Sequence, residues 1–106
     1  MKEDRRHPRR EAPDGSIAIC GSKPFRLLDY SENGVGLRFY GDDDISEDMD
    51  IILLVPEKDL PGDELKCRKV YDVTMKKTGT FTYSRDRRIG LQFVEPQPDL
   101  VKAMEG

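Results

Sequence analysis

Apolar and polar residues alternate along much of the chain, most clearly in segments 25–28, 35–40 and 89–94. Successive side chains of a β-strand point to opposite faces, so a period of two predicts strands with one buried face. We expect the apolar residues of these segments to share one core. They are Phe25, Leu27, Val35, Leu37, Phe39, Ile89, Leu91 and Phe93.

Segment 51–55 has no polar position; it runs Ile-Ile-Leu-Leu-Val between acidic residues and Pro56. A short apolar run rich in β-branched residues is typical of a strand that is buried on both faces. We therefore expect a central strand here.

Segments 65–75 and 80–84 flank a turn-forming stretch that ends at Gly79, a residue free to adopt a positive φ, which predicts a hairpin. Further turn-forming residues gather at 21–24, 32–34, 41–42, 56–62 and 85–88. Turns at this spacing, with no helical pattern between the strands, favour an all-β barrel or sandwich over a parallel α/β sheet.

One helix is expected near 98–104. Pro98 opens it, and Leu100, Val101 and Met104 follow at helical spacing. A chain of 106 residues is long enough for one domain with a single core.

The composition is polar, with 36% hydrophobic and 37% charged residues, but it retains enough apolar residues for a modest core. No apolar run approaches the roughly 20 residues that cross a bilayer, so no membrane insertion is expected. The basic N-terminus is followed by Glu11, Pro13 and Asp14 instead of an apolar stretch. This argues against a secretory signal and for a cytoplasmic protein.

Few residues suggest metal or redox chemistry. Cys20 and Cys67 lie far apart in strand-like segments, which is typical of small buried thiols. His7 has no second histidine or cysteine nearby, so no metal site and no cofactor are expected.

The net charge of −3 conceals an uneven distribution. Residues 1–10 hold five basic and two acidic side chains, whereas residues 41–50 hold six acidic side chains and no basic one. A local basic cluster on an acidic chain indicates a site for a small anion rather than a surface for a nucleic-acid polymer.

The basic cluster is Arg5-Arg6-His7-Pro8-Arg9-Arg10. Pro8 disfavours helix, so we expect a bent, extended loop. Guanidinium groups bind phosphate oxygens or the O6/N7 edge of guanine in pairs of hydrogen bonds, and they stack on purines. The cluster suits a guanine nucleotide, although a solvated basic tail is equally compatible with this stretch alone.

A second candidate stretch is Asp29-Tyr30-Ser31-Glu32-Asn33-Gly34. Asp29 and Ser31 are two residues apart, so in a strand their side chains point to the same side and can converge on a polar ligand. Gly34 supplies the unhindered backbone that a turn needs. A turn that only closes a hairpin explains the same residues.

The order of these motifs, R-x-x-x-R, D-x-S-x-x-G and the closing strand Arg88-Ile-Gly-Leu-Gln-Phe-Val94, resembles the PilZ domain over nearly the whole chain. The resemblance implies a small antiparallel six-stranded β-barrel with a short C-terminal helix. Residues 1–13 would form a flexible arginine-rich arm, and residues 14–106 would form the barrel domain. Many PilZ domains are bacterial receptors for cyclic di-GMP.

The resemblance also implies roles for individual residues. Arg5 and Arg9 would bind the phosphates and guanine bases, while Asp29, Ser31 and Gly34 would form the opposite wall. Two registers of the arginine motif remain open. The second is formed by Arg6 and Arg10, and the choice affects whether one or two cyclic di-GMP molecules bind.

We therefore expect a cyclic di-GMP receptor that changes conformation on binding and signals to an unidentified protein partner. No nucleophile and base are paired in the sequence, so no enzymatic activity is expected. One alternative is a PilZ-like adaptor that binds protein without nucleotide. Another is a small β-barrel that binds single-stranded nucleic acid.

Overall fold

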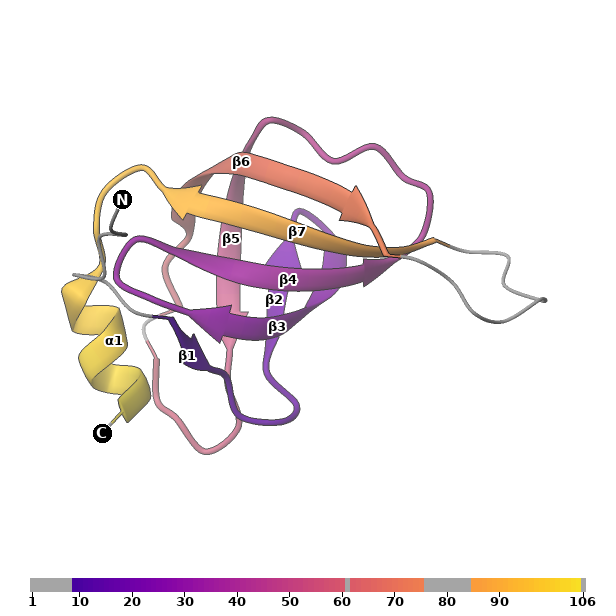
Figure 1. The fold of residues 1–106 in the computed structure, drawn as a ribbon. Coiled ribbons are helices and arrows are strands. Elements are labelled where there is room, and N and C mark those ends of the chain that lie inside the picture. Colours follow the sequence, from indigo (N-terminus) through magenta and orange to yellow (C-terminus); the bar gives the residue numbers. More distant parts are fainter. Residues whose placement is uncertain (1–8, 61, 76–84, 106) are drawn as a thin grey trace, which may run out of the picture.

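The computed structural model describes residues 9–60, 62–75 and 85–105. These ranges form a set of strands followed by one helix (Figure 1). In chain order the elements are β1 (Arg10–Glu11), β2 (Ile17–Cys20), β3 (Lys23–Tyr30), β4 (Gly34–Tyr40), β5 (Asp48–Leu54), β6 (Leu65–Thr74), β7 (Asp86–Phe93) and α1 (Pro98–Glu105).

Six of the strands close into an antiparallel barrel. The order around the barrel is β3, β2, β5, β6, β7 and β4, and pairing between β4 and β3 completes the circle. The short strand β1 pairs with the far end of β3, with Arg10 opposite Tyr30 and Glu11 opposite Asp29. The six-stranded antiparallel barrel with a C-terminal helix is therefore confirmed.

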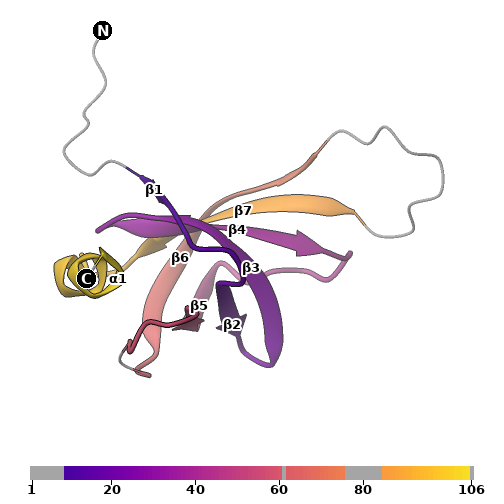
Figure 2. The same ribbon diagram turned by 90° about the horizontal axis from the view of Figure 1, so that it is seen from below.

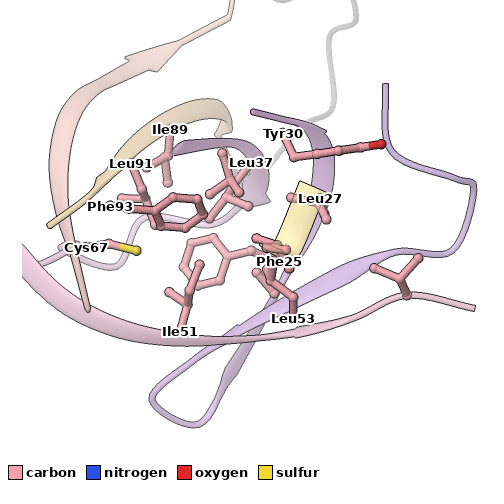
Figure 3. Close-up of a cluster of buried hydrophobic side chains, with 14 of the residues drawn as sticks. Phe25, Leu27, Tyr30, Leu37, Ile51, Leu53, Cys67, Ile89, Leu91 and Phe93 are labelled. Carbon is pink, nitrogen blue, oxygen red and sulfur yellow. The ribbon is translucent and has the colours of Figure 1, made fainter. Parts of the chain in front are cut away.

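The core lies inside the barrel (Figure 3). The predicted inward-facing residues are buried, except that Phe39 is only partly buried. Phe39 stacks on Phe25 with ring centroids 4.5 Å apart. At one end of the barrel, Leu100 and Met104 of α1 pack against this core, as the helical spacing predicts.

The prediction for segment 51–55 is wrong in one respect. Ile51, Leu53 and Val55 are buried, but Leu54 is 50% exposed. A closed barrel has one inner face, and no described helix or strand is layered on the outside of β5, so this strand alternates like the others. Its apolar outward residues concealed the alternation in the sequence.

The structure describes the first arm of the predicted hairpin but not the second. Strands β6 and β7 pair antiparallel, but segment 80–84, the expected second arm, lies outside the described residues. The turn expected at 85–88 is wrong, because Asp86–Phe93 is one continuous strand.

Arg87 explains why this charged segment forms a strand. Its side chain points inward and is nearly fully buried, and it donates two hydrogen bonds to the carboxylate of Asp72 on β6. It also donates to the carbonyl oxygens of Gly41 and Asp43, at 3.0 and 2.7 Å. These partners satisfy a buried charge that the sequence alone places in a loop.

The two cysteines are free thiols; Cys67 is buried and Cys20 is partly buried. Burial raises the pKa of Cys20 to about 11 and that of Cys67 to about 12. Within the described part of the chain, no helix is long and apolar enough to cross a bilayer.

Candidate functional site

The candidate site lies on the outer surface of three adjacent strands, β3, β4 and β7 (Figure 1). The strand register places Arg26 opposite Arg38, and Arg38 opposite Arg88. Arginines from three strands therefore form one row across the outside of the barrel. Arg38, the middle arginine of this row, donates two hydrogen bonds to Asp86 of β7, at 3.0 and 2.9 Å.

The neighbouring row has small residues at its centre. Asp29 of β3 is opposite Gly36, Gly36 is opposite Gly90, and Gly90 is opposite Tyr71 of β6. A methyl group added to Gly36 would lie 2.5 Å from Asp29 Oδ1, and one added to Gly90 would lie 2.3 Å from the ring of Tyr71. Gly36 and Gly90 thus leave an area of the outer face without side chains, which we call the glycine floor. The carboxylate of Asp29 lies against it from one side, and the ring of Tyr71 lies against it from the other.

An irregularity in β3 sets the direction of Asp29. Leu27 and Tyr30 are both buried in the core, although strict alternation would place them on opposite faces. The pairing of β3 with β4 shifts register between Leu27 and Asp29, so Leu28 is an extra residue. Because of this bulge, Asp29 faces outward onto the glycine floor.

The N-terminal segment reaches this floor directly. Arg9 Nη1 donates to Asp29 Oδ1 at 2.6 Å, and both side chains are partly exposed. The next residue, Arg10, turns to the C-terminal helix, where its Nε lies 2.7 Å from Glu105 Oε2. Adjacent arginines therefore connect the segment to the candidate site and to α1.

The other two residues of the D-x-S-x-x-G motif serve the hairpin. Ser31 is buried, its hydroxyl accepts a hydrogen bond from the Asn33 amide at 3.2 Å, and its own amide donates to the Gly34 carbonyl at 2.9 Å. Gly34 lacks the positive φ that would make glycine necessary for the turn. Its Cα instead lies close to β7, because a methyl group added to Gly34 would lie 2.2 Å from the carbonyl oxygen of Leu91.

A hollow of about 350 Å³ adjoins this surface, bounded on one side by the chain that follows β1. Its lining includes Arg26, Asp29 and Arg88. Arg88 Nε is buried and has no hydrogen-bond partner among the described residues. A buried donor without an acceptor is costly, so this nitrogen marks a place where an added acceptor would be stabilising.

The structure thus brings together Arg9 and Asp29 and directs Arg10 toward α1. Arg5, Arg6, His7 and Pro8 lie outside the described residues, so their predicted contacts remain predictions. Sequence reasoning gave no firm role to the arginine row, the glycine floor or Tyr71. These residues are brought together by strand register, which local patterns do not reveal.

The described ranges contain no group of three or more histidine, cysteine, aspartate or glutamate side chains that could hold a metal ion. The chemistry of the surface is that of guanidinium groups, one carboxylate and an aromatic ring. Such a surface binds a planar, polar anion by paired hydrogen bonds and stacking.

These features define a closed β-barrel with an arginine-lined outer face. A search of solved structures finds a similar arrangement in the "PilZ domain with c-di-GMP of YcgR from Escherichia coli". The TM-score is 0.61 at 17% sequence identity, and the alignment covers 97% of this chain and 87% of that one. The protein therefore has a PilZ-like fold. No protein-family model and no curated protein matches the sequence.

Proposed function

We propose that the protein is a noncatalytic receptor for cyclic di-GMP, which binds on the outer face of β3, β4 and β7. The observation that carries the proposal is the contact of Arg9 with Asp29 on the glycine floor, beside the unpartnered Nε of Arg88. The similarity to a PilZ domain solved with c-di-GMP supports the same ligand.

The chemistry of the site matches the two parts of this ligand. Guanidinium groups of Arg9 and Arg88 pair with phosphate oxygens or with guanine O6 and N7. The carboxylate of Asp29 accepts hydrogen bonds from guanine N1–H and N2–H₂, a pair of donors that adenine does not offer in this arrangement. Selectivity for guanine therefore rests on Asp29, and retention of the phosphates rests on the arginines.

Binding is coupled to the N-terminal segment by exchange of partners. In the free protein, Asp29 is occupied by Arg9, so a guanine edge displaces this guanidinium toward the phosphates. An exposed ion pair contributes only about 0–1 kcal/mol, so the exchange costs little. Arg10 holds the same segment to Glu105, and its movement carries the change to α1. We propose that this altered surface is what a protein partner recognises.

Calorimetry tests the roles of these residues, with cyclic di-GMP compared against GTP and cyclic di-AMP. We expect Arg9→Ala and Arg5→Ala each to weaken cyclic di-GMP binding by at least about 2 kcal/mol, the value of a charge-assisted bond to phosphate. Asp29→Ala should mainly reduce the preference for guanine over adenine.

Arg85→Ala is a matched control for Arg9→Ala. Arg85 is a similarly exposed arginine in an ion pair, with Asp42 at 3.0 Å, but it lies at the other end of the barrel wall. Its loss should leave the affinity unchanged. Full affinity in both Arg5→Ala and Arg9→Ala would contradict the assigned roles. Absence of binding by the native protein would instead favour an adaptor that recognises only protein.

A further inference from the structure

Strand β6 is only half covered on the side that faces away from β7. Strand β5 pairs with its first residues, from Leu65 to Arg68, and the Lys69 amide donates to the Glu47 carbonyl at 2.7 Å. From Val70 to Thr74, no described strand pairs with this side; the chain between β4 and β5 passes beside it in Figure 1 without forming a strand, and Figure 2 shows the same part of β6 from below. We call residues 71–75 the open edge.

The backbone direction along the open edge follows from one hydrogen bond. The Met75 amide donates to the Asp86 carbonyl of the neighbouring chain segment at 2.7 Å. In an antiparallel pair this direction alternates, so the N–H and C=O groups of Tyr71 and Val73 also face β7. The corresponding groups of Asp72 and Thr74 face outward and are available to another strand.

The side chains of the open edge give it little of the usual protection of an exposed strand. Edge strands are commonly guarded by charged side chains, proline or a bulge, and the one charge here, Asp72, is neutralised by Arg87. The register shift in β6 lies before Tyr71, and residues 71–75 contain neither lysine nor proline. Tyr71 is 44% exposed and Val73 is 48% exposed, both on the outer face. A regular strand with free hydrogen-bonding groups and exposed apolar side chains is a site for strand addition.

We propose that a second copy of this chain pairs with the open edge, antiparallel, with Val73 on the two-fold axis. In this register Val73 faces Val73 of the second copy, and Tyr71 faces Met75 of the second copy. The outward groups of Asp72 then meet those of Thr74 of the second copy, which satisfies all four. The edge is therefore complementary to itself.

Charge favours the register with Val73 on the axis over the register with Asp72 on the axis. A two-fold axis at Asp72 would place two carboxylates directly opposite each other, an arrangement that is destabilising in a sheet. With Val73 on the axis, each Asp72 faces a threonine and remains paired with Arg87 of its own chain. The nearby acidic residues are also neutralised internally, since Asp42 pairs with Arg85 and Asp43 with Lys23.

The pairing would join two barrels through one continuous sheet. A two-fold axis between antiparallel strands is perpendicular to the sheet, so both outer faces, with their glycine floors, would point the same way. Pairing along this short edge buries little surface, whereas stable interfaces bury about 1,200–2,000 Å² in total. We therefore expect a dimer that dissociates on dilution.

Disulfide trapping tests the register. Facing residues that share no hydrogen bonds in an antiparallel pair have Cα atoms about 4.5 Å apart, which is within the range for a disulfide. Val73→Cys should therefore give covalent dimers under mild oxidation. Tyr71→Cys and Val94→Cys should not, because neither residue meets its own copy. The native cysteines add little background, because burial raises their pKa values to about 11 and about 12.

Sedimentation equilibrium on the full chain tests the edge without a covalent bond. Val73→Lys should raise the dimer dissociation constant at least about tenfold, since it places two lysines on the axis. Val94→Lys adds the same charge at a valine that is 60% exposed and lies away from the open edge, and it should change the constant less than about twofold. Circular dichroism confirms that both variants are folded.

Three results would overturn the proposal. The first is a native chain that stays monomeric up to about 1 mM, which would leave the open edge to a strand from another protein. The second is equal weakening by Val73→Lys and Val94→Lys. The third is covalent trapping by Tyr71→Cys but not by Val73→Cys, which would place the axis elsewhere.

Discussion

Gly34 and Gly36 are two residues apart on β4, yet each glycine is required for a different reason. At Gly34 the neighbour is the backbone of β7, which cannot move without disturbing the barrel wall. At Gly36 the neighbour is the carboxylate of Asp29, the end of a side chain that can rotate away. One glycine therefore supports the fold, and the other keeps the site accessible.

A pair of substitutions separates these roles. Gly34→Ala should destabilise the protein by about 2 kcal/mol or more, the usual cost of overpacking against rigid atoms. Gly36→Ala should change stability by less than about 1 kcal/mol but should weaken cyclic di-GMP binding about tenfold, because Asp29 is displaced. Chemical denaturation and calorimetry measure the two effects. The opposite pattern would contradict the division.

Individual residues of the site could be predicted only in part. The chemistry of Arg9 and Asp29 makes them candidates, the resemblance to the PilZ domain implies that they form opposite walls of one site, and the structure places them in contact. In the sequence, Arg88 stands where a turn-forming stretch meets the closing strand, and this position gives it no firm role in the site. Its importance depends on the register of β7 against β4, which pairs it with Arg38. Local sequence carries no information about such a cross-strand neighbour.

At the scale of the element, the buried ion pair of Asp72 and Arg87 holds the end of β6 against the start of β7. The side chains are 18% and 3% exposed, and Arg87 also holds the chain after β4 through two carbonyl oxygens. Hydrogen bonds from Arg87 hold the pKa of Asp72 below its ordinary value. This pair therefore links pH to the stability of the hairpin.

The direction of the pH effect follows from that lowered pKa. Folding favours the ionised carboxylate, so the stabilisation by Asp72 is complete above its unfolded pKa of about 3.9. It is lost as the pH falls through the lower folded value. Asp72→Asn should cost about 3 kcal/mol at pH 7, because Arg87 stays buried without its counter-charge. The deficit should shrink in acid.

Denaturant unfolding between pH 7 and pH 2 measures this effect. Asp42→Asn is the control, because Asp42 pairs with Arg85 in a more exposed position. We expect its stability to differ from the native value by at most about 1 kcal/mol. A deficit for Asp72→Asn that is independent of pH would rule out the linkage.

For the whole molecule, the alternation of side chains predicted an all-β barrel or sandwich, and the resemblance to the PilZ domain implied the six-stranded barrel, in which every strand has one inner and one outer face. The alternation failed where a strand carries apolar residues on both faces, as at Leu54, or a buried charge, as at Arg87. Neither strand order nor the bulge in β3 is visible in periodicity. The class of fold was therefore predictable, whereas the composition of the site was not.

Salt should affect the two proposed associations, ligand binding and dimer formation, to different extents. Cyclic di-GMP is an anion on partly exposed arginines, so its affinity should fall about tenfold as the Debye length shrinks from about 30 Å at 0.01 M salt to about 3 Å at 1 M. The Arg9→Ala variant should show a smaller decrease. The dimer, joined by backbone hydrogen bonds and apolar side chains, should respond little. Salt-independent ligand affinity would contradict the electrostatic account.

Leu28, the extra residue of the bulge, reverses which positions of β3 point into the barrel. Before it, odd-numbered positions of β3 point to the interior; after it, even-numbered positions do. On a regular strand with the same residues and no bulge, the side chain of Asp29 would turn toward the apolar interior and the ring of Tyr30 would turn outward. Grafting this face onto another barrel therefore means copying an irregular backbone spacing along with the side chains.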